Sequence, residues 1–143
     1  MNVKAEKYNK FLQEKNIKFF QCDEIKDEMN SVVYRSFLEV NGQNLPIWIG
    51  IDDSIYVMIH VRLGVKLLKD TNKEALLTYF NALNSRYKVF KYYANNQGDL
   101  IIESCLATSN DAFVPEMIHV IIDVILKHLI KEYPVLMKTV WGN

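Results

Sequence analysis

Hydrophobic and polar positions alternate with a period of two between Val32 and Leu63, which is typical of β-strands with two unlike faces. One parity class is almost purely aliphatic: Tyr34, Ser36, Leu38, Val40, Leu45, Ile47, Ile49, Ile51, Ile55, Val57, Ile59, Val61 and Leu63. The other class mixes aromatic, basic and polar side chains: Arg35, Phe37, Glu39, Asn44, Pro46, Trp48, Tyr56, Met58, His60 and Arg62. The pattern predicts an antiparallel meander with a buried aliphatic face and a mixed outer face.

The first turn of this meander sets its register. Asn41-Gly42 is a strong hairpin signal because both residues tolerate positive φ, and a two-residue loop there pairs Arg35 with Trp48. Pro46 has no amide proton, so we expect it at an edge-facing or bulged position.

The second turn lies around Asp52-Asp53-Ser54. It needs an odd number of residues, because a slip of one residue would move every following side chain to the opposite face. We therefore expect a three-residue loop that pairs Ile51 with Ile55.

The rest of the chain predicts three helices and three further strands. We expect helices at residues 3–14, 71–85 and 115–133, a first strand at 17–25, and a second hairpin from strands 89–94 and 100–106. Thr71 and Glu74 have the spacing of a capping box for the second helix. Pro134 is expected to stop or kink the third helix, which leaves a short final turn that ends at Gly142.

This order of elements indicates the fold class. A helix, four strands, a helix, two strands and a helix, without regular alternation, are typical of an α+β protein. We expect an antiparallel sheet of five to six strands with three helices, in the order α-β-β-β-β-α-β-β-α. A chain of 143 residues fits a single domain, residues 1–143, with one substantial core.

Charge argues against a nucleic-acid partner. Lysine plus arginine and aspartate plus glutamate each total 17, so the formal net charge is zero. Proteins that bind nucleic acids usually carry a basic excess, because phosphate neutralisation dominates their affinity. We therefore expect no nucleic-acid binding.

The sequence also predicts a cytoplasmic protein without membrane contact. Met1–Lys10 is polar and lacks the apolar core of a signal peptide, and charged or imidazole side chains interrupt the longest apolar stretch, Met117–Ile130. Cys22 and Cys105 are far apart and form no Cys-x-x-Cys motif, which is typical of reduced thiols.

The mixed face of the meander is the candidate partner-binding surface. Its members combine two guanidinium groups, an imidazole, three aromatic rings and a thioether: Arg35, Phe37, Trp48, Tyr56, Met58, His60 and Arg62. Tryptophan, tyrosine and arginine are enriched in interface hot spots. Three alternatives remain open: a structural cation–π pair between Arg35 and Trp48, a helix that covers this face, and a small-molecule pocket near Tyr56, His60 and Arg62.

A wide apolar stripe on the second predicted helix is the candidate homodimer interface. It consists of Leu76, Leu77, Tyr79, Phe80 and Leu83. The alternative is that these side chains belong to the core of one chain, in which case the protein should be a monomer at micromolar concentration.

Catalytic and metal-binding patterns give no support for an enzyme. Glycine-rich phosphate loops, nucleophile elbows and His-Glu-x-x-His motifs do not occur. His119 and Asp123 have helical spacing, but two ligands do not make a metal site, and we expect them to pair with each other next to Lys127. We expect no catalytic residues, no metal and no cofactor.

Several segments of the C-terminal half resemble the YbjN-type family, whose members are described as bacterial sensory transduction regulators. They are residues 83–87 (LNSRY), 90–91 (FK), 98–103 (GDLIIE), 113–116 (FVPE), 132–137 (EYPVLM) and 141–142 (WG). These motifs are structural rather than chemical, and the similarity extends over nearly the whole chain. The first hairpin is tighter and more aliphatic here than the family pattern.

The resemblance implies a fold like that of type III secretion chaperones. It also implies a bacterial, cytosolic and non-enzymatic α+β domain that forms a homodimer and acts by binding another protein. It supplies no catalytic residue.

Overall fold

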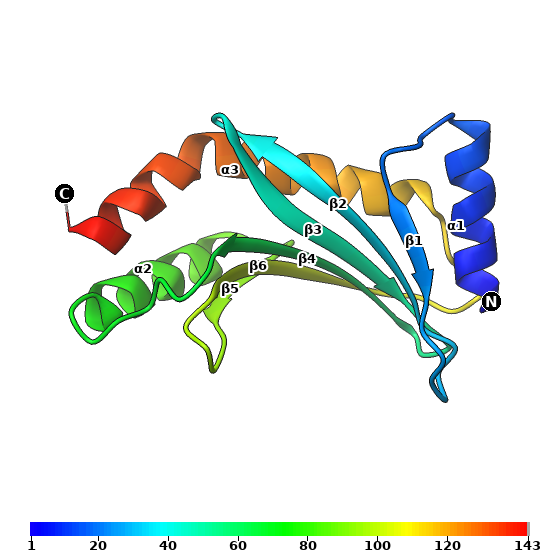
Figure 1. Ribbon diagram of the computed structural model, residues 1–143, viewed down its shortest axis with the longest axis horizontal. Coiled ribbons are helices and arrows are strands. Elements are labelled where there is room, and N and C mark those ends of the chain that lie inside the picture. Colours follow the sequence, from blue (N-terminus) through cyan, green and yellow to red (C-terminus); the bar gives the residue numbers. More distant parts are fainter. Residues whose placement is uncertain (143) are drawn as a thin grey trace.

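Six antiparallel strands form one open sheet in the order β1-β2-β3-β4-β6-β5, and three helices pack against it (Figure 1). The structure, a computed structural model, describes residues 1–142. Its elements are α1 (Val3–Glu14), β1 (Gln21–Glu24), β2 (Val32–Val40), β3 (Gln43–Ile51), β4 (Tyr56–Gly64), α2 (Lys73–Arg86), β5 (Lys91–Ala94), β6 (Leu100–Ala107) and α3 (Glu116–Trp141). This order confirms the predicted α+β class.

The aliphatic parity class forms the inner face of the sheet. Tyr34, Ile49, Val57 and Ile59 are completely buried, and the neighbouring strands add further aliphatic side chains to the same core. Ile55 is an exception, because its side chain is 53% exposed in the turn before β4. The prediction that Ile55 belongs to the core is therefore wrong.

All three helices lie on this inner face. The ring of Tyr8 in α1 packs edge-on against Tyr34 of β2, with ring centroids 4.8 Å apart. At the other end of the sheet, Phe80 of α2 lies 5.3 Å from the ring of Tyr92 in β5. Figure 1 shows α3 running from the α1 end of the sheet to the α2 end. Within residues 1–142 no helix covers the opposite face of the sheet (Figure 1), and the predicted partner-binding residues lie there.

The first hairpin has the predicted register. Asn41 and Gly42 have φ values of 51° and 83°, and Arg35 pairs with Trp48. Pro46 lies in an interior strand rather than at an edge, opposite Phe37 of β2. The pairing of β3 with β4 begins only at Ile47, however, so the missing amide of Pro46 interrupts no pair in that ladder.

The second turn is longer than predicted. Ile51 pairs with Val57 rather than with Ile55, so five residues lie between the paired positions. Their number is odd, as the parity of the two faces requires. The added length accommodates a local turn in which Asp52 Oδ1 accepts a hydrogen bond from the Ser54 amide at 2.9 Å.

The first strand is shorter than predicted and includes only Gln21–Glu24. Asn16 adopts a left-handed conformation, φ 55°, and the Ile17 amide donates to the Leu12 carbonyl, so the residues after α1 complete the end of that helix. Phe20 then packs against the core beside Tyr8.

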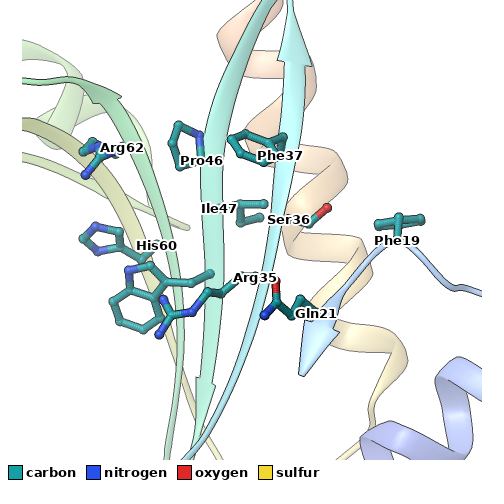
Figure 2. Close-up of a pocket in the computed structure, with 10 residues that line it drawn as sticks. Phe19, Gln21, Arg35, Ser36, Phe37, Pro46, Ile47, His60 and Arg62 are labelled. Atoms are coloured by element: carbon teal, nitrogen blue, oxygen red, sulfur yellow. The ribbon is translucent and has the colours of Figure 1, made fainter. Parts of the chain in front are cut away.

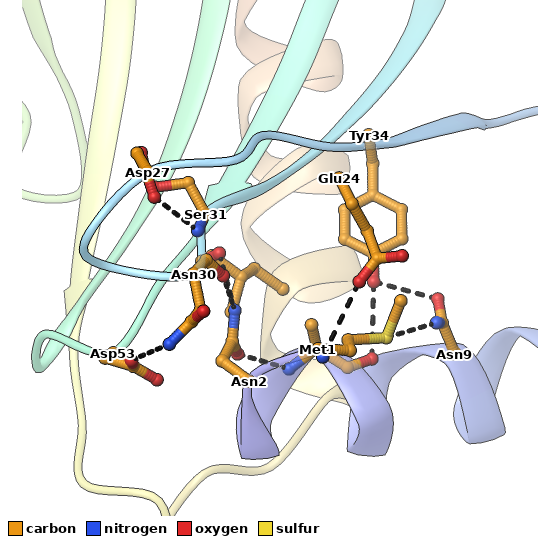
Figure 3. A network of polar contacts seen from close by, with 11 residues as sticks. Met1, Asn2, Asn9, Glu24, Asp27, Asn30, Ser31, Tyr34 and Asp53 are labelled. Atoms are coloured by element: carbon orange, nitrogen blue, oxygen red, sulfur yellow. Dashed lines mark hydrogen bonds and ion pairs between the residues drawn. The ribbon is translucent and has the colours of Figure 1, made fainter.

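Asn2 ties the start of α1 to the sheet (Figure 3). Its Oδ1 accepts from the Ala5 amide at 2.8 Å, which caps the helix. Its Nδ2 donates to the carbonyl oxygens of Asn30 at 2.8 Å and Ile51 at 2.9 Å. One buried amide side chain therefore connects α1 to the open end of the β2–β3 hairpin, where β2 begins and β3 ends.

The predicted capping box at Thr71 and Glu74 is wrong. Asn72 occupies the position before α2, and its side chain does not cap that helix. Asn72 Oδ1 accepts from the Lys69 amide at 2.7 Å, and Nδ2 donates to the carbonyls of Leu67 at 2.8 Å and Val140 at 3.1 Å. The residue therefore joins the β4–α2 connection to the last turn of α3.

The third helix continues through Pro134 and ends at Gly142, so the predicted break before a short final turn is wrong. A proline inside a helix leaves the carbonyl four residues earlier, here that of Ile130, without its usual amide donor. Asn41 Nδ2, at the tip of the β2–β3 hairpin, donates to that carbonyl at 3.1 Å. This long-range contact compensates for the proline and also anchors the hairpin.

Two histidines of α3 face the core and pair with tyrosines. His119 Nε2 lies 2.8 Å from the Tyr8 hydroxyl, and His128 Nε2 lies 2.7 Å from that of Tyr92. The predicted pairing of His119 with Asp123 is wrong, because Asp123 forms an ion pair with Lys127 at 2.9 Å. Burial lowers the pKa of both imidazoles, and for His128 the charge of Glu132 partly offsets this effect.

Acidification should therefore destabilise the fold. Histidines of the unfolded chain have pKa values of about 6.5, so they take up protons at a higher pH than the same residues in the folded chain. The free energy of unfolding is therefore highest above this pH and falls as the pH decreases below it. Urea midpoints measured at pH 7.5 and 5.5 should show this decrease. The double variant His119→Gln/His128→Gln should show a smaller decrease, and an equal decrease would contradict the assignment.

Candidate functional site

The structure places all seven predicted partner-binding residues on the outer face of the sheet. Arg35 and Phe37 lie on β2, Trp48 lies on β3, and the remaining four, Tyr56, Met58, His60 and Arg62, lie on β4. The alternation of side chains along each strand brings them to one face, as the sequence pattern predicted. Phe37 is 65% exposed, whereas the His60 side chain is mostly buried.

A groove with a volume of about 480 Å³ crosses this face (Figure 2). Ten residues line it: Phe19, Gln21, Arg35, Ser36, Phe37, Pro46, Ile47, Trp48, His60 and Arg62. Five of the seven predicted residues are among them. In Figure 2, Arg62 and His60 lie on one side of the groove, and Phe37 and Phe19 lie on the other.

Tyr56 and Met58 belong to a separate hollow of about 390 Å³ near the start of β4. Trp48 lines both hollows and is the residue they share on this face. The small-molecule alternative expected Tyr56, His60 and Arg62 around one pocket. The structure brings together only His60 and Arg62.

The Trp48 indole has a defined position between its neighbours. It stacks on the His60 imidazole, with ring centroids 4.6 Å apart and an angle of 16° between the planes. Gly50 lies beside it, and a Cβ atom on Gly50 would come within 3.0 Å of Trp48 Cζ3. The absence of a side chain at Gly50 therefore leaves room for the indole to lie along the sheet.

His60 is held in place by Glu103, a buried carboxylate of β6. His60 Nδ1 lies 2.8 Å from Glu103 Oε2, and the Tyr93 hydroxyl donates to the same oxygen at 3.1 Å. Lys91 Nζ lies 3.7 Å from Oε1. Since an ionised carboxylate only accepts hydrogen bonds, Nδ1 is the donor, and Nε2 remains for other interactions.

Arg35 interacts with a carboxylate rather than with an aromatic ring. Its Nε donates to Asp23 Oδ2 of β1 at 3.2 Å. Arg35 and Trp48 are cross-strand neighbours, as predicted, but the cation–π contacts found within residues 1–142 join Arg86 with Tyr87 and Lys91 with Tyr93. The predicted Arg35–Trp48 cation–π pair is therefore not formed.

The predicted dimer stripe on α2 is divided by the structure. Leu76, Phe80 and Leu83 are buried in the core of the single chain, so they cannot contact a second copy without repacking. Tyr79 is half-buried and donates to Glu132 Oε1 at 2.6 Å. Leu77 remains exposed. Core packing thus accounts for most of the stripe, and the homodimer stays a prediction.

Five of the ten lining residues lie outside the predicted set, namely Phe19, Gln21, Ser36, Pro46 and Ile47, and the support of His60 by Glu103 was also missed. Phe19 was assigned to a strand that the structure shortens, and no pattern placed it on the same groove as Phe37. Glu103 belongs to a segment that reads as an ordinary strand, and only the pairing of β4 with β6 places it opposite His60. A signal for Glu103 did exist, because a carboxylate inside an apolar run requires a partner when buried.

Residues 1–142 contain neither a cluster of metal ligands nor a membrane-spanning helix. Within them, no group of three or more histidine, cysteine, aspartate or glutamate side chains is arranged to hold a metal ion. Cys22 and Cys105 are exposed and not joined to each other. Over the same residues, every helix is too short or too polar to cross a bilayer.

Comparison with protein-family models and with curated proteins finds no match to this chain.

Proposed function

We propose that this chain is a non-enzymatic binding module, regulatory or chaperone-like, whose outer sheet face takes a segment of a protein partner. One observation carries the proposal: the helices all pack on the inner face, while the outer face is hollowed and carries aromatic and basic side chains. Exposed Phe37 and Phe19, both more than 60% accessible, border the groove. Apolar side chains gathered on an open face are typical of interaction sites.

The edge of β2 supports a role in binding an extended segment. β1 pairs only with Val32–Arg35, so within residues 1–142 no strand lies beside Ser36–Val40 on that side. Alternate backbone amide and carbonyl groups of such an edge are directed away from β3. A partner can therefore use the groove, the edge or both.

The resemblance to YbjN-type regulators agrees with this proposal. It suggests a bacterial, cytoplasmic protein that acts by binding another protein as a homodimer, with a fold like that of type III secretion chaperones. We retain these properties as parts of the proposal, without a catalytic residue, cofactor or nucleic-acid partner.

Substitution of Phe37 by aspartate tests the proposal. Phe37 is 65% exposed, so Phe37→Asp should fold normally, yet it places a charge on the groove and should weaken partner capture at least about tenfold. The measurement is affinity capture from lysate of the native host, with circular dichroism as a test of folding.

Val120→Asp is the matched control, because Val120 is 51% exposed on α3, away from the sheet's outer face. A partner held by the wild type and by Val120→Asp, and lost by Phe37→Asp, supports the module and its site. Equal capture by both variants would place the site elsewhere.

A small-molecule sensor is the second candidate, because His60 and Arg62 line the same groove. A ligand there should raise the melting temperature in a metabolite screen. At a hundredfold excess over Kd, ligand binding should increase the free energy of unfolding by about 2.7 kcal/mol. That stabilisation should disappear in His60→Ala.

A further inference from the structure

The lining of the groove is electrically one-sided. It contains the guanidinium groups of Arg35 and Arg62 and the imidazole of His60, but no carboxylate. The chain as a whole has equal numbers of acidic and basic side chains. Because Asp23 pairs with Arg35 and Glu103 pairs with His60, the basic character of the lining rests on Arg62, where charge can contribute to recognition.

Two carboxylates beside the lining are already engaged. Asp23 bonds to Arg35, and Glu103 bonds to His60. Glu39 lies beyond Phe37 toward the tip of the hairpin and does not line the groove.

Arg62 is the cation with most remaining donor capacity. It is exposed, and within residues 1–142 no ion pair or hydrogen bond of its side chain is found. It does act on Asp99 at a distance: the Lys66 amide mainly, and the Arg62 charge to a smaller extent, hold the pKa of Asp99 below its usual range. Its guanidinium donors remain for a ligand, and a guanidinium binds a carboxylate in a bidentate manner.

The opposite side of the groove is aromatic. Phe37 and Phe19 expose most of their ring surface, and Pro46 lies between this side and Arg62 in Figure 2. A side chain that packs there removes apolar surface from water on both partners. The groove thus combines a basic side with an apolar side.

We propose that the groove recognises an acidic, aromatic-containing segment of a protein partner in an extended conformation. An aspartate or glutamate of the segment bonds to Arg62, and a neighbouring aromatic residue packs against Phe37 and Phe19. An extended chain directs alternate side chains to one face, so such a segment can present both groups to the groove. This inference rests on the proposed function and adds the chemistry of the partner.

Trp48 provides a direct signal for the test. The chain has two tryptophans, so Trp141→Phe leaves Trp48 in the groove as the single indole. Three synthetic heptapeptides serve as probes: alternating aspartate and phenylalanine, the same with lysine for aspartate, and the same with alanine for phenylalanine. Titration with the aspartate–phenylalanine peptide should change Trp48 fluorescence. The lysine–phenylalanine and aspartate–alanine peptides should bind at least about tenfold more weakly.

Charge reversal at Arg62 makes the test specific. In the same background, Arg62→Glu should weaken binding of the aspartate peptide about tenfold and strengthen binding of the lysine peptide. Lys138→Glu changes the net charge equally at an exposed position of α3 and should leave both affinities unchanged.

Equal affinity for the aspartate and lysine peptides, no binding of either, or no effect of Arg62→Glu would overturn the acidic-segment inference. The proposed function is judged separately. If Phe37→Asp still abolishes capture of a cellular partner in those cases, the binding module stands and only the chemistry of its partner is wrong.

Discussion

Asn72→Ala should lower the free energy of unfolding by about 2–4 kcal/mol. Asn72 is 8% exposed, and its side chain makes three hydrogen bonds: from the Lys69 amide, and to the carbonyls of Leu67 and Val140. Alanine removes all three and leaves poorly solvated backbone groups without partners, which costs more than the bonds themselves contribute. Urea denaturation followed by circular dichroism measures the loss.

Asn81→Ala is the control for this prediction. Asn81 lies on the exposed side of α2, the helix that follows Asn72. Its replacement by a better helix former should change the free energy of unfolding by less than about 0.5 kcal/mol. A similarly small loss for Asn72→Ala would show that water replaces the side chain, and that the β4–α2 connection is not held by it.

The faces of the meander could be predicted because they depend on local parity. Each residue of β2, β3 and β4 has a side determined by its position in the strand, and the Asn41-Gly42 turn fixes the register of the first two strands. The length of the second turn could not be predicted in this way. Loops of three and five residues satisfy the same parity, and the choice depends on the side-chain contacts of Asp52.

The ends of helices were harder to predict, because distant residues determine them. Pro134 is an expected helix breaker because it leaves the Ile130 carbonyl without an amide donor. The side chain of Asn41, 89 positions away in the sequence, donates to that carbonyl instead. The role of Asn72 was missed because the spacing of Thr71 and Glu74 suggested a capping box instead. Its hydrogen-bond partner, the Val140 carbonyl, lies 68 positions away and leaves no local pattern. Local propensity is overruled where such a contact forms.

The face that carries the candidate residues was predictable, but the composition and arrangement of its groove were not. Parity placed all seven residues on one face, whereas the order of strands β4, β6 and β5 decided which carboxylate lies beside His60. The separation of Tyr56 from His60 into different hollows depends on where Trp48 lies, and that depends on Gly50 and His60. Such packing relations are properties of the folded chain.

Glu103→Ala should destabilise the protein by about 1–3 kcal/mol and release the Trp48–His60 wall of the groove. Glu103 accepts from His60 Nδ1 and from the Tyr93 hydroxyl, and its side chain is 9% exposed. Burial mainly, with the charge of Glu103 and the hydrogen bond to it, raises the pKa of Tyr93 to about 12, so this hydroxyl remains a donor at physiological pH. Without the carboxylate, His60 loses the bond that fixes its ring.

Two measurements test this prediction in the Trp141→Phe background. Urea denaturation gives the loss of stability, and fluorescence anisotropy of Trp48 reports the freedom of the indole. Glu103→Gln, which keeps an acceptor for His60, should show a smaller change in both. A loss of stability with unchanged Trp48 anisotropy would mean that Glu103 supports the sheet but does not order the groove.

The same variant separates two ways in which the groove can bind its partner. Removing a carboxylate beside a basic groove should strengthen the attraction for an acidic segment if charge alone determines affinity. If the ordered Trp48–His60 wall matters more, Glu103→Ala should bind the aspartate peptide more weakly, because the partner must then order the wall on binding. We expect weaker binding, since the stack, the buried carboxylate and the space above Gly50 together fix Trp48 before any partner arrives.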